Sequence, residues 1–169
     1  TNIGQIANYT PNLTFQNNPS FSGSSNSAAV YIRGVGQKEF LPTTEPGVGI
    51  YVDGVYIARS VGAILDLIDV QQVEVLRGPQ GTLFGRNTIG GAISLTTRKP
   101  GPELRGDVSV TVGDDDRADL SASIDIPLSD TLFSTLSVAR FNRDGYVTRE
   151  DGVDLGDDDT LTGRLALRW

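Results

Sequence analysis

The chain has 169 residues, a formal net charge of −7, no cysteine and no histidine, which removes disulfides, zinc–thiolate sites and the commonest general base. These gaps argue against hydrolases, proteases and zinc enzymes, although carboxylate pairs or a lysine could still support other chemistry, and the acidity argues against non-specific nucleic-acid binding. No apolar run of about 18 residues occurs, so a membrane role is open only through β-structure.

Residues 1–100 combine short apolar runs with loops rich in glycine, serine, asparagine and proline. The apolar spacing in 2–9 predicts a short helix that Pro11 ends, and 63–69 predicts a second helix. Five apolar runs predict strands: LTFQ, AVYIRG at 29–34, VGIYVDGVYI at 48–57, VEVLRG at 73–78 and AISLTT at 92–97. The Asp53–Gly54 pair within the third run predicts a two-residue hairpin turn. These elements indicate a small mixed α+β domain.

The composition changes at RKPGPE, residues 98–103, where proline and glycine mark the domain boundary. Beyond it, apolar and polar side chains alternate in segments that predict four strands: 107–112, 119–128, 131–141 and 160–169. The connection at 127–131 is a tight turn, and the connection at 142–159 is long and charged. Strands of about ten residues with such connections are typical of outer-membrane β-barrels, but an antiparallel sheet with one wet face has the same alternation. Four strands are too few to close a barrel, which needs at least about eight.

One block, VEVLRGPQGTLFGRNTIGGAISLTTRKP at 73–100, resembles the plug-domain signature of TonB-dependent outer-membrane receptors. VYIRGVG at 30–36 and GIYVDGVYIAR at 49–59 resemble two further blocks of that plug, in the same order. The resemblance implies an α+β plug domain, a small mixed sheet with short helices, over residues 1–100. It implies that residues 101–169 are the first four antiparallel β-strands of a truncated transmembrane β-barrel. It also implies a non-enzymatic receptor of the bacterial outer membrane, with the plug on the periplasmic side of the barrel lumen.

The function implied by the resemblance is TonB-energised uptake of a scarce nutrient, such as a ferric siderophore, cobalamin or a glycan, without cofactor or resident metal. Expected partners are the TonB–ExbB–ExbD complex, acting through a segment upstream of this chain, the nutrient ligand and outer-membrane lipid. A signal-transducing receptor with an extra N-terminal domain and a soluble α+β binding module remain as alternatives. Because the chain contains no methionine, we expect a processed or excised piece, with the signal peptide, the TonB box and the remaining barrel strands outside it.

The plug motif supplies the candidate site residues: Arg33, Gly34, Asp53, Gly54, Glu74, Arg77, Gly78, Pro79, Gly81, Gly85, Arg86, Asn87, Gly90 and Gly91. Its glycines at 78, 81, 85, 90 and 91 are expected to allow positive φ or close backbone approach inside a cylinder, and Pro79 is expected to fix the turn. By resemblance, the charged members at 33, 74, 77 and 86 are candidates for pairing within the plug or with the barrel wall. The alternatives are ordinary loop glycines and solvated charges, whose pairs contribute about 0–1 kcal/mol.

Ligand contact is expected, by resemblance, from the loops that follow YIRG and YVDG. The candidate residues are Gln37, Lys38, Phe40, Arg59 and Ser60, among which an aromatic ring and a guanidinium suit stacking or ion pairing. Two aspartate clusters, Asp114–Asp116 in the first barrel hairpin and Asp157–Asp159 in the long loop, have side chains that can hold Ca²⁺. Their spacing does not match an EF-hand loop, so we expect solvated loops there.

Overall fold

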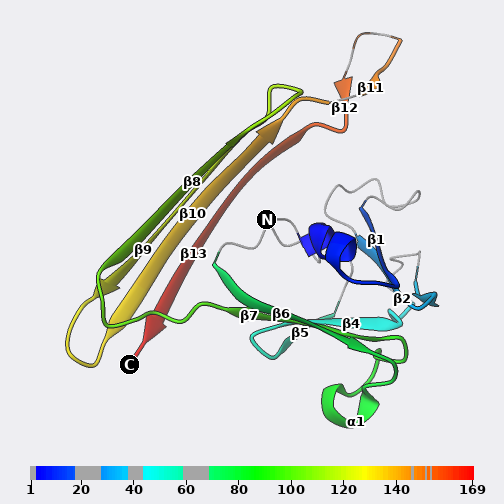
Figure 1. The fold of residues 1–169 in the computed structure, drawn as a ribbon, viewed down its shortest axis with the longest axis horizontal. Coiled ribbons are helices and arrows are strands. Elements are labelled where there is room, and N and C mark those ends of the chain that lie inside the picture. The colour runs from blue at the N-terminus through cyan, green and yellow to red at the C-terminus, as the bar shows by residue number, and fades with distance from the viewer. Residues whose placement is uncertain are drawn as a thin grey trace. The chain divides into compact units, whose positions relative to one another are not determined.

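The structure is a computed structural model in which the chain forms two compact units, Thr1–Thr97 and Arg98–Trp169 (Figure 1). It describes residues 3–17, 28–37, 44–58, 69–145, 147–150, 152 and 154–169. Strands dominate both units. In these described ranges, no helix has the length and apolar character that crossing a membrane would require.

The first unit begins with a helix and a small antiparallel sheet. The expected N-terminal helix is present as a 3₁₀ helix, η1 (Ile3–Tyr9), and the three strands that follow are β1 (Leu13–Asn17), β2 (Ala28–Ile32) and β3 (Val35–Gly36), in the order β1-β2-β3. The strand predicted at 29–34 is wrong at its end, because Arg33 and Gly34 form a hairpin turn with φ of 52° and 80°. The Arg33 N–H donates to the Asn12 carbonyl at 2.8 Å, which helps to hold this turn.

The second sheet of the first unit is mixed, as expected. Its strands are β4 (Val48–Val52), β5 (Val55–Ile57), β6 (Val70–Arg77) and β7 (Gly91–Thr97), in the order β5-β4-β7-β6. Strands β4 and β7 are parallel, and the other two pairings are antiparallel. The predicted turn at Asp53–Gly54 is confirmed, with φ of 49° and 81°. A four-residue helix, α1 (Gly81–Phe84), lies between β6 and β7, whereas positions 63–68 of the predicted second helix lie outside the described residues.

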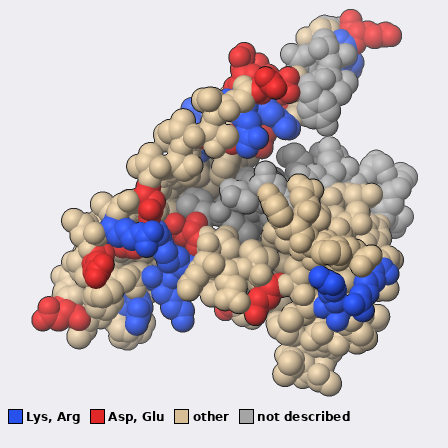
Figure 2. Space-filling model, in the orientation of Figure 1, with Lys and Arg blue, Asp and Glu red and all other residues tan. Residues whose placement is uncertain are grey.

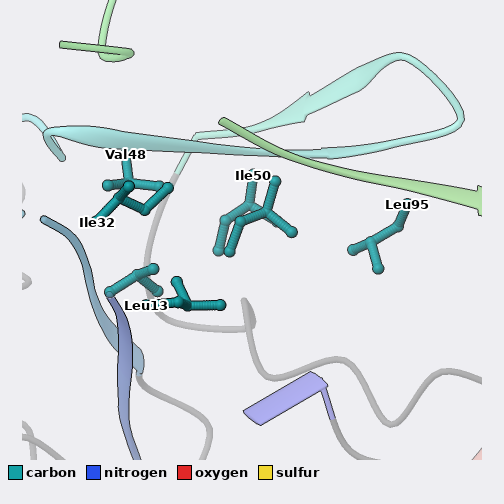
Figure 3. Close-up of a cluster of buried hydrophobic side chains, with 7 residues drawn as sticks. Leu13, Ile32, Val48, Ile50 and Leu95 are labelled. Atoms are coloured by element: carbon teal, nitrogen blue, oxygen red, sulfur yellow. The ribbon is translucent and has the colours of Figure 1, made fainter. Parts of the chain in front are cut away.

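Apolar side chains from both sheets of the first unit form its core. In Figure 3 the labelled side chains of Leu13, Ile32, Val48, Ile50 and Leu95 lie close together between strands of the two sheets. Burying each such side chain stabilises the fold by about 1.5–3 kcal/mol. Ile6 and Ala7 of η1, expected to lie on one helix face, also pack on this cluster. The first unit therefore has an apolar core of its own.

The second unit is an open antiparallel sheet. Its strands are β8 (Arg105–Val112), β9 (Ala118–Pro127), β10 (Phe133–Arg143) and β13 (Asp158–Arg168), in the order β13-β10-β9-β8. All four predicted strands are present. The long loop is shorter than expected, because Asp158 and Asp159 belong to β13, and it contains a two-stranded hairpin of β11 (Val147–Thr148) and β12 (Asp154–Leu155).

This second sheet has one apolar and one polar face. The register places most of the large apolar side chains of the four strands on one face, and these are 37–77% exposed: Val108, Val110, Val112, Leu120, Ile124, Ile126, Leu136, Val138, Leu161, Leu165 and Leu167. The opposite face carries small polar and charged side chains, among which Asp125, Thr135 and Ser137 are buried. In the view of Figure 2, charged side chains of this sheet gather towards its two ends. The alternation predicted from the sequence is thus confirmed.

Candidate functional site

In the glycine-rich loop between β6 and β7, a side chain is least tolerated at Gly90 and Gly91, where the chain enters β7. A Cβ on Gly90 would lie 2.8 Å from the Val35 carbonyl oxygen, and a Cβ on Gly91 would overlap the Leu76 carbonyl oxygen. Gly91 also has a φ of 146°, which side chains rarely adopt. The expectation of close backbone approach therefore holds at these two positions.

The other glycines of the motif differ in what they need. Gly78 and Gly85 have positive φ, of 87° and 78°, as expected, and Pro79 follows the first of them at an exposed position. Gly81 corrects the expectation, because it begins α1 without a positive φ and has open space where a Cβ would lie. A four-residue helix is too short to leave a periodic pattern in the sequence, so the sequence did not reveal it.

Side chains of β4 and β5 fasten this loop to the sheet. The Tyr51 hydroxyl donates to the Phe84 carbonyl at 2.7 Å, and the two rings meet edge to face with centroids 4.8 Å apart. Asn87, a motif residue with a φ of 66°, donates from Nδ2 to the Tyr56 hydroxyl at 2.8 Å. Burial, and secondarily the neighbouring Tyr56, raises the pKa of the Tyr51 hydroxyl. The loop is thereby held by hydrogen bonds and ring packing that residue order alone did not predict.

Asp53 of the hairpin turn closes the end of β7. Its carboxylate accepts a hydrogen bond from the Thr97 N–H at 2.8 Å and another from the Thr97 hydroxyl at 2.6 Å. Its own N–H donates to the Leu95 carbonyl at 2.8 Å, which extends the parallel pairing of β4 and β7 by one bond. Sequence reasoning missed Thr97, which stands two positions after Leu95, the last apolar residue of β7. A threonine at the end of a predicted strand is the only sign of it in the sequence.

The four charged candidates divide into one pair and three exposed side chains. Arg86 pairs with Glu45 at 3.0 Å on the surface of the first unit, so its partner lies within the unit. Glu45 was not among the candidates, because 41 residues separate the two in the chain. Arg33, Glu74 and Arg77 are exposed and form no ion pair with another described residue. Their side chains are thus accessible to a partner of opposite charge.

Of the candidate ligand-contact residues, only Gln37 is described. It follows β3 and is half-buried, and its side-chain oxygen accepts no hydrogen bond from the described part of the chain. Lys38, Phe40, Arg59 and Ser60 lie outside the described residues. Their expected role in ligand contact stays a prediction.

The aspartate clusters do not assemble a metal site within the ranges that the structure describes, where no group of three acidic, histidine or cysteine side chains comes together. Asp115 and Asp116 form the turn between β8 and β9 with positive φ of 57° and 49°. Asp158 accepts a hydrogen bond from Thr160 at 2.8 Å, and Asp159 pairs with Arg140 at 3.4 Å. The second cluster therefore mostly belongs to β13, which corrects its assignment to the loop.

Comparison with known proteins identifies similar chains along the whole sequence. The family model "TonB-dependent Receptor Plug Domain" matches residues 1–92. The pesticin receptor of Yersinia pestis is 34% identical over 161 residues, covering 94% of this chain and 23% of that protein. The vitamin B12 transporter BtuB of Vibrio vulnificus is 29% identical over 133 residues, covering 76% of this chain and 20% of that protein.

Among solved structures, the ferric yersiniabactin uptake receptor FyuA from Yersinia pestis superposes with a TM-score of 0.86 and 30% identity. This superposition covers 99% of the chain and 26% of that receptor. The chain therefore spans about a quarter of the length of the Yersinia pestis receptor sequence and structure that it matches.

Proposed function

Since this chain belongs to the family of TonB-dependent receptors, we propose that it forms the plug and the first four barrel strands of an outer-membrane receptor for active nutrient uptake. Members of this family are transport receptors and not enzymes. In this proposal residues 1–100 are the plug and residues 101–169 begin the barrel wall. The plug occupies the periplasmic side of the lumen and gates it.

The observation that carries the proposal is the exposed apolar face of the second unit. Contiguous apolar patches of more than a few hundred square ångströms are rare on soluble monomers. A barrel wall needs such a face towards lipid, with polar side chains alternating towards the lumen. The sheet of β8, β9, β10 and β13 supplies both faces, and it follows directly on a glycine-rich unit of the plug family. Contact with lipid accounts for the apolar face of this sheet, and contact with a hydrated lumen accounts for its polar face.

For the substrate, we favour a ferric siderophore. Support comes from the names of similar proteins, which include a ferric yersiniabactin uptake receptor and a ferrioxamine B receptor that is 29% identical over 85 residues. The contacts would come from the loops that contain Gln37, Lys38, Phe40, Arg59 and Ser60. Cobalamin and glycans are the competing substrates, and the similarity to a vitamin B12 transporter makes cobalamin the first of them to test.

The exposed charges of the plug suggest how it is retained and released. Arg33, Glu74 and Arg77 are accessible, and we assign their partners to the polar lumen wall of the complete barrel. Ion pairs in a hydrated lumen are worth only about 0–1 kcal/mol each. Several such pairs orient the plug, yet each yields to a modest force. Force would be delivered by the TonB–ExbB–ExbD complex through a segment upstream of Thr1.

The proposal is tested with the full-length receptor in a bacterial strain that lacks its own siderophore and cobalamin receptors. Uptake of iron-labelled siderophores and of labelled cobalamin is measured with and without a functional TonB gene. We expect uptake of at least one ferric siderophore that stops when TonB is removed. TonB-independent uptake, or an outer-membrane receptor that takes up none of the offered nutrients, would contradict the proposal.

A further inference from the structure

The first residues of the second unit, 98–100, contact its polar face through the Arg98 side chain and the Pro100 carbonyl. Arg98 donates from Nη1 to the Asp107 carboxylate at 3.0 Å and from Nη2 to the Ser123 hydroxyl at 3.0 Å. Its Nη2 also lies 3.9 Å from the Asp125 carboxylate. Asp107 on β8 and Ser123 on β9 are directly paired in the sheet, so one guanidinium bridges two strands of the wall.

A second attachment comes from the other edge of the same sheet. Arg168 on β13 donates from Nη1 to the Pro100 carbonyl at 3.2 Å. Its guanidinium also lies over the Phe133 ring, 6.0 Å from the centroid, and Phe133 is its register partner on β10. Because β8 and β13 are the outer strands of this sheet, the connecting residues are held from both edges.

Arg98 approaches a buried carboxylate, that of Asp125, although the Asp107 carboxylate that accepts its hydrogen bond is half exposed. The Arg98 and Asp125 side chains are 23% and 6% exposed, whereas those of Arg86 and Glu45 are 74% and 59% exposed. Charge-assisted hydrogen bonds gain strength when water is excluded, and removing one partner of a buried charge leaves the other poorly solvated. Without Arg98, the buried Asp125 carboxylate would retain the hydroxyl of Thr135, which it contacts at 2.5 Å. Loss of Arg98 is therefore expected to destabilise the structure only around the Asp125 carboxylate and the residues next to Arg98.

The residue before Arg98 is fastened on the other side of the unit boundary. Thr97 donates two hydrogen bonds to Asp53 within the first unit. Two consecutive residues are thus held by different units, and no free residue lies between the two attachments. Displacement of the first unit would consequently be concentrated at the peptide that joins Thr97 to Arg98.

We propose that Arg98 is a positioning residue that anchors the downstream end of the plug to the barrel wall during transport, an inference that rests on the proposed function. TonB-driven displacement then moves the plug about the Thr97–Arg98 peptide while residues 98–100 stay on the wall. If both arginine attachments were lost, the free tether would comprise residues 98–104, between the end of β7 and the start of β8. Those residues would span roughly 25 Å when extended. With the arginine attachments in place this tether is not free, so the plug returns to the same position after each round of transport.

The attachment is tested by hydrogen exchange in the full-length receptor, reconstituted in liposomes and measured by mass spectrometry. In Arg98→Gln, we expect the backbone amides of residues 98, 99, 101, 103 and 104 to exchange about tenfold faster, because a charge-assisted bond network is lost, whereas Pro100 and Pro102 have no amide hydrogen. Arg98→Lys should fall between this variant and the wild type. The matched control is Arg105→Gln, which removes a more exposed cation from the same Asp107 carboxylate. We expect no change in the control, and unchanged exchange in β8 and β9 in every variant.

A double variant separates the specific pairing from a general loosening. Asp125→Asn alone should also accelerate exchange of the connecting residues. In the Arg98→Gln background, however, the same change should have little further effect, since the two side chains act through one interaction. Additive effects of the two substitutions would overturn the assignment of Asp125 as a partner of Arg98.

The role in transport is tested by nutrient uptake with the same variants. Arg98→Gln should reduce TonB-dependent uptake several-fold without changing ligand affinity, and Arg98→Lys should restore part of it. Exchange of the connecting residues at the wild-type rate in Arg98→Gln overturns the anchor, and faster exchange with normal uptake overturns its role in transport. If the wild-type receptor takes up no nutrient, the proposed function and the transport role fail together, whereas the exchange data still decide whether Arg98 attaches the chain to the wall.

Discussion

The two four-stranded sheets of this protein solve the burial of apolar side chains in different ways. In the first unit, β7 is buried along most of its length and its side chains join a core shared with a second sheet. In the second unit, β8 is exposed along its whole length although every second residue from Val108 to Val112 is valine. The apolar side chains of the first sheet are buried by other residues of this chain, whereas those of the second sheet are not covered by the described residues. Substitutions should therefore have effects that depend on where each sheet finds its apolar environment.

The largest effect is expected in the core of the first unit. Ile93 on β7 is fully buried, so Ile93→Ala should lower the local free energy of opening by about 2–5 kcal/mol. Ile89 lies four positions earlier and is 72% exposed, which makes Ile89→Ala a matched control with little expected effect. The measurement is hydrogen exchange of the β7 amides in the full-length receptor. Equal costs for the two substitutions would mean that the first unit lacks a core around Ile93.

A slightly smaller loss of stability is expected from substitutions that test whether the apolar face of the second sheet contacts lipid or water. Val108 and Ser109 are neighbours on β8, both exposed, and their side chains point to opposite faces. If the apolar face contacts lipid, Val108→Arg should destabilise the full-length receptor by about 2–4 kcal/mol in liposomes, with Ser109→Arg much less costly. Denaturant unfolding in liposomes measures both. In a soluble sheet the two arginines would be tolerated equally, so equal stabilities would remove the comparison on which the barrel interpretation depends.

The glycine-rich loop offers a third comparison, between Gly91, where a side chain would not fit, and Gly81, where it would. Gly91→Ala should cost about 1–3 kcal/mol, because its φ is unfavourable and its Cβ would overlap a carbonyl oxygen. Gly81→Ala should be neutral or stabilise the loop by up to about 1 kcal/mol, since position 81 lies in α1 with open space around it. Hydrogen exchange of the loop amides measures both substitutions. A loss of stability in the second variant would contradict the corrected role of this position.

The sequence predicted what depends on short-range pattern. Alternation located the four strands of the second unit, and the Asp53–Gly54 pair located a hairpin turn, because both signals lie within a few residues. Arg33–Gly34 makes a similar turn, but arginine is not a residue that signals one, so the strand was extended too far. Helix boundaries inside a four-residue segment were equally beyond a periodic signal.

Contacts between residues far apart in the sequence could not be predicted from the sequence. Asp53 and Thr97 are 44 residues apart, and they meet only because β4 and β7 lie parallel and in register. Arg98 was visible as one charge in a segment recognised by its prolines, but its partner Ser123 lies 25 residues further on, across a strand pairing. Local pattern fixes the elements, whereas such pairs require the register of the sheet.

The smallest expected effect concerns the tyrosine that fastens the loop to the first sheet. Tyr51→Phe removes the hydrogen bond to the Phe84 carbonyl and should cost about 1 kcal/mol at neutral pH. Because burial raises the pKa of Tyr51 in the folded state, the unfolded chain releases this proton first as the pH rises. The stability that the neutral hydroxyl contributes is therefore complete below a pH of about 10 and is lost as the pH rises through the folded-state value. Loop exchange compared with a pH-matched reference peptide should show this loss in the wild type and not in Tyr51→Phe. A loss of the same size in both proteins would assign the alkaline sensitivity to a different group.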